Sequence, residues 1–206
     1  MPDFQNHPLV ADRLARLRSA TCPPRDFRHY VSDIARLLVL PATANLATKE
    51  TEVTTPLTSM TGLELARPIV LVPILRAGLG FSEAFLQMLP EATVAHYGMN
   101  RNEESLQPEV YLERIPDHIA GAEVFVLDPM LATGGSAITA IDGLKKRGAK
   151  HLHFVCLVAS PEGIKSLEES HPDVIITVAA IDEGLNEQGY IVPGLGDAGD
   201  RIFGTL

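Results

Sequence analysis

Hydrophobic positions along this chain alternate between two periodicities, which predict strands and helices in turn. Runs of consecutive apolar residues are typical of strands that are buried on both faces. They predict strands at residues 69–75, 93–97, 124–127, 154–159 and 174–179. Apolar residues at helical spacing predict helices between the strands, at residues 81–89, 136–146 and 161–170. This alternation predicts an α/β fold, a Rossmann-like and mostly parallel sheet with helices on both faces and ligands at the carboxyl ends of its strands.

The first quarter of the chain is expected to be helical. Residues 8–47 carry two apolar stripes at helical spacing, and the second stripe begins after Pro23 and Pro24. We expect Pro41 to end or kink the second helix, because proline lacks an N–H and collides with the preceding turn. Residues 51–57 alternate weakly and predict a short strand that leads into a loop. Residues 98–121 form a long polar excursion, which in a compact domain is usually functional or mobile.

The segment after the strand at 124–127 has the composition of a phosphate site. Asp128 ends the strand, and the small residues 132–136, with sequence Ala-Thr-Gly-Gly-Ser, come directly before a helix. The first turn of a helix has unsatisfied N–H groups and about half a positive charge, so it favours a phosphate. A tight turn without a ligand is the alternative for a Gly-Gly pair. Asp128 suits sugar hydroxyls or a metal-bound ligand, which favours a phosphorylated sugar. Neither the triphosphate motif nor the dinucleotide motif is present.

Two further segments are candidates for the same site. Residues 76–80 follow a strand and precede a helix, and Arg76 adds a forked, charged donor to small residues. The alternative is a surface arginine beside a turn. The run 194–200 is too rich in glycine for the interior of an element, and its alternative is a loose terminal loop. Apolar residues on both sides of this run, at 191–192 and 202–203, should hold it against the core.

The composition of the chain limits the kinds of ligand and the cellular compartment that we expect for the protein. The 206 residues suit a single domain, residues 1–206, and the formal net charge of −9 argues against a nucleic-acid surface. The negative net charge does not exclude a small phosphorylated ligand, because Arg76 and Arg101 can neutralise the charge of such a ligand locally. Cys22 and Cys156 fit a reducing compartment, and no signal peptide or membrane-length apolar run is seen, so we expect a cytoplasmic protein that contacts no membrane.

The histidines and possible nucleophiles do not point to another site. His151 and His153 alternate on one strand, but no third ligand is identifiable, so a partly exposed strand start is favoured over a metal site. The sequence shows no arrangement of the Ser-His-Asp, Cys-His or H-E-x-x-H type.

Residues 127–136 and 189–200 resemble two motifs of the uracil phosphoribosyltransferases, a branch of the type I phosphoribosyltransferase family. Shorter matches lie at residues 7–10, 73–78 and 101–104, and the similarity extends from about residue 7 to the C-terminus. Other phosphoribosyltransferases of this fold usually carry two adjacent acids where this chain has Asp128 and Pro129. The proline is itself a feature of the uracil branch.

The resemblance implies an activity. Uracil and 5-phospho-α-D-ribose 1-diphosphate (PRPP) are converted to UMP and diphosphate in pyrimidine salvage, with Mg²⁺ bound mainly through PRPP. It also implies a flexible β-hairpin lid at about 98–121, a uracil-binding C-terminal segment at about 184–206, a homodimer or higher homo-oligomer, and GTP as an allosteric activator. Glycosyl transfer through an oxocarbenium-like transition state needs no protein nucleophile.

The resemblance also assigns residues. PRPP is expected to contact Arg76, Ala77, Gly78, Arg101, Asp128, Pro129, Met130, Leu131, Ala132, Thr133, Gly134, Gly135, Ser136 and Asp197. Backbone groups of Ile191, Gly196 and Ala198 are expected to pair with uracil, next to Asp197. Asp197 and Arg101 are the expected catalytic residues, and a strained peptide is expected near Arg76. Glu103 and Glu104 are interpreted as surface carboxylates.

Two other functions remain open. A phosphoribosyltransferase for another base would turn over hypoxanthine or orotate as well as uracil. A nucleotide-sensing regulator would retain the fold without catalysis, although one that acts on RNA should show a basic face, and this chain is acidic.

Overall fold

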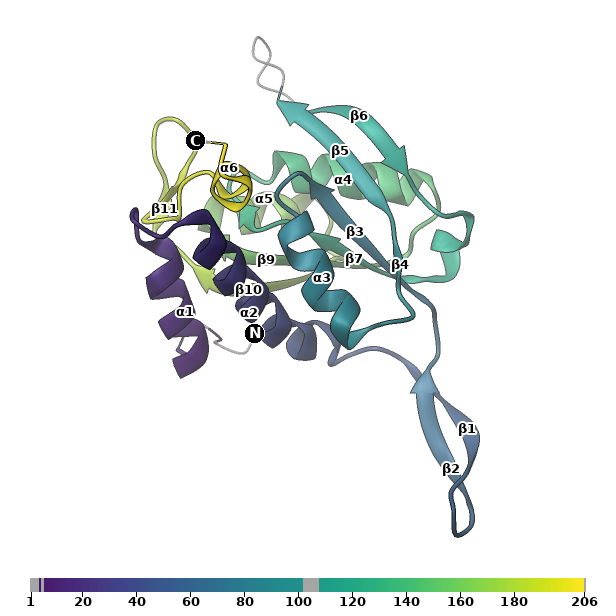
Figure 1. The fold of residues 1–206 in the computed structure, drawn as a ribbon. Helices are drawn as coiled ribbons and strands as arrows, with labels where there is room; N and C mark the ends of the chain where they lie inside the picture. Colours follow the sequence, from purple (N-terminus) through teal and green to yellow (C-terminus); the bar gives the residue numbers. More distant parts are fainter. Residues whose placement is uncertain (1–3, 5, 102–107, 206) are drawn as a thin grey trace.

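A central, mostly parallel sheet organises the chain in the computed structural model, which describes residues 4, 6–101 and 108–205. Its strands run in the order β10-β9-β7-β3-β5-β6 (Figure 1). Their bounds are β3 (Ile69–Leu75), β5 (His96–Arg101), β6 (Pro108–Arg114), β7 (Glu123–Leu127), β9 (His151–Ala159) and β10 (Ile175–Ile181). Two short strands extend the sheet: β4 (Thr93–Val94) pairs with β3, and β8 (Met130–Leu131) pairs with β9. Within the described part of the central sheet only the β5–β6 pair is antiparallel, so the carboxyl ends of the parallel strands lie at one edge.

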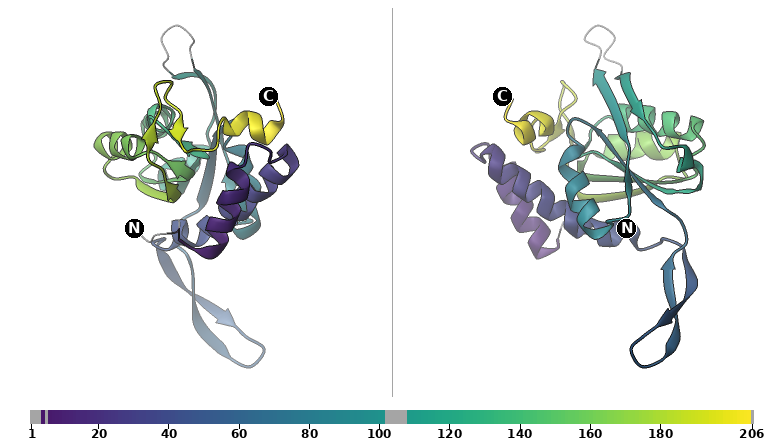
Figure 2. Two further views of the ribbon diagram at one scale, coloured as in Figure 1. Left: turned by 90° about the vertical axis from the view of Figure 1, so that its left-hand side faces the viewer. Right: turned by 45° about the vertical axis from the view of Figure 1, so that its right-hand side comes forward.

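Helices cover both faces of the sheet (Figure 2). One face packs on α2 (Pro24–Thr43) and α3 (Leu79–Met88), with α1 (Pro8–Arg18) packed against α2, and the other face packs on α4 (Gly135–Lys146) and α5 (Pro161–Ser170). Side chains of a strand alternate between faces. Phe125 and Leu127 of β7 therefore join the core on the α1–α3 side, and Val124 and Val126 join the core on the α4–α5 side. The predicted α/β fold is confirmed.

The C-terminal part forms smaller elements above the strand ends. These elements are β11 (Gly184–Leu185), β12 (Ile191–Val192) and α6 (Ala198–Phe203). Strand β11 pairs antiparallel with β12, and α6 packs on α2. The expected apolar anchors of the glycine-rich run are half correct: Ile191 and Ile202 are buried in the core on the α1–α3 side, whereas Val192 and Phe203 are exposed. Leu195, within the run, is also buried in this core.

Two local predictions in the first third of the chain have different outcomes. The short strand predicted within residues 51–57 is present as β1 (Thr48–Thr54) and leads into a loop, and it is one half of a hairpin with β2 (Ser59–Leu65) that projects away from the sheet (Figure 1). Most of its side chains are exposed, so burial leaves little period-2 signal in the sequence. Helix α2 does not end at Pro41 but continues to Thr43. A proline so close to the end disturbs only the last turn, where the Thr43 hydroxyl donates to the Val39 carbonyl at 2.8 Å.

The described parts of the polar excursion, residues 98–101 and 108–121, contain the end of β5, all of β6 and a 3₁₀ helix, η1 (Asp117–Gly121). Strand β5 pairs antiparallel with β6, which agrees with the β-hairpin that the resemblance implies. Glu103 and Glu104 lie outside the described residues.

The histidines differ in part from expectation. His151 is partly exposed as predicted, but His153 is buried. The His153 ring stacks on Phe125 with centroids 4.6 Å apart, and its Nε2 lies 3.0 Å from Glu123 Oε2.

Candidate active site

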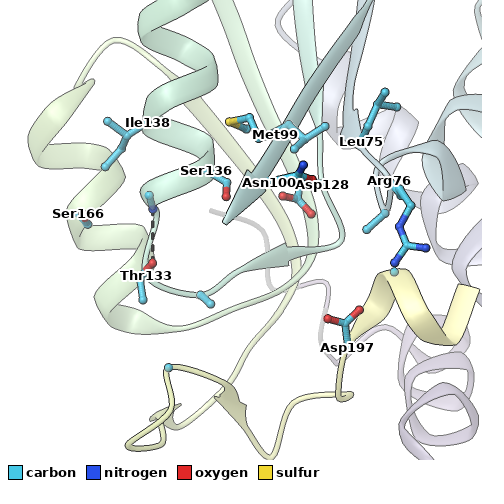
Figure 3. Close-up of a pocket in the computed structure, with 16 residues that line it drawn as sticks. Leu75, Arg76, Met99, Asn100, Asp128, Thr133, Ser136, Ile138, Ser166 and Asp197 are labelled. Carbon is cyan, nitrogen blue, oxygen red and sulfur yellow. Dashed lines mark hydrogen bonds between the residues drawn. The ribbon is translucent and has the colours of Figure 1, made fainter. Parts of the chain in front are cut away.

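A cavity of about 500 Å³ opens at the carboxyl ends of β3, β5 and β7 (Figure 3). Thr133 and Ser136 lie at one end of it, beside the start of α4, and Arg76 lies at the other, with Asp128 between them. Parallel strands bring these segments together because their carboxyl ends meet at one edge of the sheet. The cavity is therefore built mainly from two strand–loop–helix units, β3 to α3 and β7 to α4, together with the end of β5.

The loop before α4 is shaped by close packing against α5. Gly134 precedes the helix with a φ of +86°, a left-handed conformation that favours glycine. A Cβ on Gly163 of α5 would lie 2.3 Å from the Ala132 carbonyl oxygen, so only glycine allows this approach. The Ser160 hydroxyl donates to the same carbonyl at 2.6 Å. These contacts hold the first turn of α4, whose N–H groups have no partner within the helix, at the cavity.

Asp128 has an unusual protonation equilibrium. Burial raises its pKa to about 7, and the nearby Asp197 carboxylate adds to this rise, while a hydrogen bond from the Met130 N–H opposes it. That bond is 3.3 Å long. A carboxylate at this position gains from a ligand that donates hydroxyl hydrogens or carries positive charge.

Arg76 lies across the cavity, where its guanidinium is held by α6. Its Nη2 donates to Asp200 Oδ1 at 2.9 Å, and the guanidinium carbon lies 5.7 Å from the centre of the Phe203 ring. The peptide bond between Leu75 and Arg76 is cis, in the loop where the resemblance implies a strained peptide. Gly78 packs against the end of β7, because a Cβ there would lie 2.2 Å from the Leu127 carbonyl oxygen.

A second cavity of about 250 Å³ adjoins the first. Five residues line both cavities: Ala77, Ala132, Gly189, Asp197 and Gly199. The Asp197 carboxylate also caps α6, accepting from the Asp200 N–H at 2.9 Å. Two connected chambers with a carboxylate at their junction suit a ligand pair in which a phosphorylated sugar meets a small ring.

Most of the predicted residues line these two cavities. The larger contains Arg76, Ala77, Asp128, Ala132, Thr133, Gly135, Ser136 and Asp197, and the smaller adds Met130, Ile191, Gly196 and Ala198. Four others lie behind the lining: Gly78, Pro129, Leu131 and Gly134. Of these, the Pro129 carbonyl accepts from the Leu157 and Val158 N–H groups, so it holds the loop to β9. Arg101 is the last residue of β5, and its side chain lies outside the described part of the structure.

Sequence reasoning missed other lining residues. Met99 and Asn100 line the larger cavity from the end of β5, where their position after a predicted strand was an available signal. Ser166 reaches the same cavity from the middle of α5, and Gln188 and Tyr190 line the smaller one. Tyr190 lies within the motif at residues 189–200, whereas no local pattern marks Ser166 or Gln188, which tertiary packing alone brings to the site.

The donor set fits a magnesium ion that a substrate brings with it. Asp128 and Asp197 are the carboxylates among the residues that line the larger cavity. Across the described ranges, no group of three or more His, Cys, Asp or Glu residues is arranged to hold a metal. Mg²⁺ commonly binds through one or two carboxylates together with substrate phosphates, so this pair suits it. None of the helices in residues 4–101 and 108–205 is long and apolar enough to cross a bilayer.

Comparisons with known proteins agree on one family. The family model described as "Uracil phosphoribosyltransferase" matches residues 4–205. A curated relative of that name from Ligilactobacillus salivarius is 53% identical over 208 residues, which cover 100% of both chains. Another from Streptococcus equi subsp. zooepidemicus is 52% identical over 201 residues, covering 97% of this chain and 96% of the relative.

Solved structures show the same fold. The AQ2163 protein from Aquifex aeolicus matches with a TM-score of 0.90 at 39% identity, covering 96% of this chain and 95% of that one. A hypoxanthine-guanine phosphoribosyltransferase from Bacillus anthracis matches with a TM-score of 0.53 at 15% identity, over 77% and 80% of the two chains. The second likeness concerns the fold alone.

Proposed function

Because this chain belongs to the uracil phosphoribosyltransferase family, we propose that it converts uracil and PRPP to UMP and diphosphate in pyrimidine salvage. One observation supports this reaction above all: two connected cavities share Asp197, and the larger runs from the start of α4 to Arg76. A sugar that carries phosphates at both ends suits the larger cavity, and a pyrimidine suits the smaller.

The larger cavity binds PRPP in this proposal. Residues 132–136 and the first turn of α4 hold the 5′-phosphate through backbone N–H groups. Asp128 accepts hydrogen bonds from the ribose hydroxyls. Arg76 gives up its hydrogen bond to Asp200 and donates to the diphosphate instead. Arg101 adds a second positive charge to the diphosphate when the β5–β6 hairpin closes. Binding at both ends orients the anomeric carbon, and the cations stabilise the charge that develops on the leaving diphosphate.

The smaller cavity binds uracil through the backbone. The ring oxygens accept from N–H groups and the ring N–H donates to a carbonyl, with Ile191, Gly196 and Ala198 as the partners. Asp197, at the junction, orients the ribose diphosphate next to the base. Cytosine turns an amine toward a donor in such a site, and an unpaired buried donor costs about 1–3 kcal/mol, or roughly ten- to hundredfold in discrimination.

We propose that magnesium enters with PRPP and that Asp128 and Asp197 help to hold it. When bound, the ion neutralises part of the diphosphate charge. We also propose that GTP activates the enzyme. Measuring UMP formation at low PRPP with and without GTP tests this activation, and equal rates would reject it.

The assembly proposed here is a homodimer or a higher homo-oligomer. The β1–β2 hairpin exposes Leu57 at 95% and Leu63 at 70% of their surface. A two-stranded hairpin is marginal in water by itself, so one that projects from the domain with exposed leucines suits packing against a second copy. Sedimentation of the wild type and of a Leu57→Asp, Leu63→Asp double variant tests this, and unchanged mass would reject the contact. The free thiols Cys22 and Cys156 fit the cytoplasm as its location.

A single assay tests the reaction. The protein is incubated with uracil, PRPP and Mg²⁺, and UMP is measured by chromatography, with hypoxanthine and orotate in parallel. Formation of UMP alone supports the proposal. Equal turnover of another base supports the broader phosphoribosyltransferase, and no product with or without GTP supports a regulator that has lost catalysis.

A further inference from the structure

The loop beside the smaller cavity is held from behind by charged side chains far from it in sequence. Gly194 is bound through both of its backbone polar groups. Its carbonyl accepts from Arg18 Nη1 at 2.7 Å, and its N–H donates to Asp182 Oδ2 at 2.9 Å. Arg18 and Asp182 also pair with each other, through two hydrogen bonds of 2.8 and 2.6 Å. One bidentate ion pair therefore holds the loop on both sides of the Gly194 Cα, through the two peptide groups that flank it.

A second arginine holds the next residue of the loop. Arg201 Nη1 donates to the Leu195 carbonyl at 2.7 Å, and its Nη2 donates to the Ser19 carbonyl at 2.6 Å. The guanidinium carbon lies 4.3 Å from the centre of the Phe27 ring. Arg201 thus connects α6 and the end of α1 with the loop, and it is buried.

These contacts fix the direction of the loop backbone. Arginines outside the cavity engage the carbonyls of Gly194 and Leu195, and Gly196, the next residue, lines the smaller cavity. Gly194 and Gly196 have φ values of +59° and +74°, in the left-handed region that favours glycine. Glycine also gives the loop backbone more conformational freedom than another residue would. Recognition by backbone groups requires placement within about 0.5 Å, so such a loop needs support from rigid neighbours.

We propose that Arg18, Asp182 and Arg201 are positioning residues that determine uracil affinity and base discrimination from outside the cavity. None of the three is among the residues that line either cavity. The inference rests on the proposed function, because the base is uracil only if the chain makes UMP. It adds that the helical N-terminal segment, through Arg18 and the Ser19 carbonyl, takes part in base recognition.

Steady-state kinetics of Asp182→Asn and Arg201→Lys test this role. Asparagine keeps the shape of Asp182 but removes the charge that Arg18 meets, and lysine keeps the charge of Arg201 but cannot reach both carbonyls with a fixed fork. We expect the KM for uracil to rise roughly ten- to hundredfold in Asp182→Asn and by a smaller factor in Arg201→Lys. The KM for PRPP and the kcat at saturating uracil should stay within about twofold, and the preference for uracil over cytosine should fall.

The matched control is Arg25→Lys, because Arg25 of α2 is exposed and pairs only with its exposed neighbour Asp26 among the contacts described. It should leave all constants unchanged. An unchanged KM for uracil, or equal loss in both KM values and kcat, would overturn the inference. If Asp182→Asn does not fold, Arg201→Lys decides by the same criterion. Wild-type protein that makes no UMP would instead reject the proposed function, so the two failures are distinguishable.

Discussion

Gly78 offers the sharpest test of how the fold positions the diphosphate site. It does not line the cavity, but it packs the Arg76 loop against the end of β7. In Gly78→Ala, the new Cβ would lie 2.2 Å from the Leu127 carbonyl oxygen, where real contacts stay beyond 3.0 Å. The nitrogen and oxygen of Ile74 would lie at 2.6 and 2.7 Å from it. All three atoms belong to buried backbone, so the loop itself must move, by about 0.8 Å.

Such a movement should reduce catalysis more than stability. A displacement of about 1 Å in a positioning group can cost roughly a hundredfold in rate. Overpacking costs about 1–3 kcal/mol of unfolding free energy, which a folded domain of ordinary stability tolerates. We therefore expect kcat/KM for PRPP to fall roughly a hundredfold in Gly78→Ala, while the protein still folds cooperatively. Initial rates of UMP formation at varied PRPP, together with thermal unfolding, measure both quantities.

The control for this substitution is Gly121→Ala. A Cβ on Gly121 meets no atom within 4 Å, so the same chemical change is made without a clash. Its activity should match the wild type. If folded Gly78→Ala retains kcat/KM for PRPP within about threefold of the wild type, the reasoning that the glycine sets the position of Arg76 is wrong.

Three further predictions follow from the charged groups. Asp197→Asn should lower turnover at least roughly a hundredfold and still fold, because asparagine caps a helix about as well as aspartate. Burial raises the pKa of Asp128 to about 7, so kcat/KM for PRPP should fall roughly tenfold per pH unit below 7, and Asp128→Asn should lose this dependence. Burial alone would raise the pKa of Glu123, but hydrogen bonds from His153 and Arg67 outweigh it and lower the pKa. Its ionised form therefore stabilises the fold above the ordinary carboxyl pKa, and this contribution is lost as pH falls through the depressed value. Denaturant unfolding should show Glu123→Gln less stable than wild type by about 1–3 kcal/mol at neutral pH, with a smaller difference in acid.

Each of these has a result that contradicts it. Wild-type kinetics in Asp197→Asn would reject its catalytic role, and a flat profile between pH 6 and 8 in the wild type would reject an essential ionised Asp128 (both limits lie about one unit from the expected pKa). For Glu123, an equal stability difference at neutral and acid pH would show that lost packing, not charge, causes the effect. Glu64→Gln is the control, since Glu64 pairs with Lys49 where both side chains are more than half exposed, and such pairs contribute little.

Local sequence was sufficient for the parts of the site that lie in one stretch of chain. The strand, the acid and the glycine loop of residues 124–136 can be predicted from a run of apolar residues that is followed by small residues. The same holds for Arg76 after β3. Because parallel strands end at one edge, these two loops were expected to meet, and they line one cavity.

The connections between distant segments required the folded structure. Arg76 meets Asp200, 124 residues away, and Arg18 meets Asp182, 164 residues away. His153 gave no local sign that it would be buried against Glu123 and Phe125. Such pairs depend on which strands become neighbours and on how a loop returns over the sheet, and periodicity carries no information about either.

The amino-acid order by itself determined the element types, the α/β class and the phosphate-type loops, since these depend on contacts within a few residues. Tertiary structure alone decided that a second chamber adjoins the first and that two arginines hold the loop beside it. The physical reason is that local backbone preferences act over one or two turns, whereas a binding site forms where packing closes segments that are separated by most of the chain.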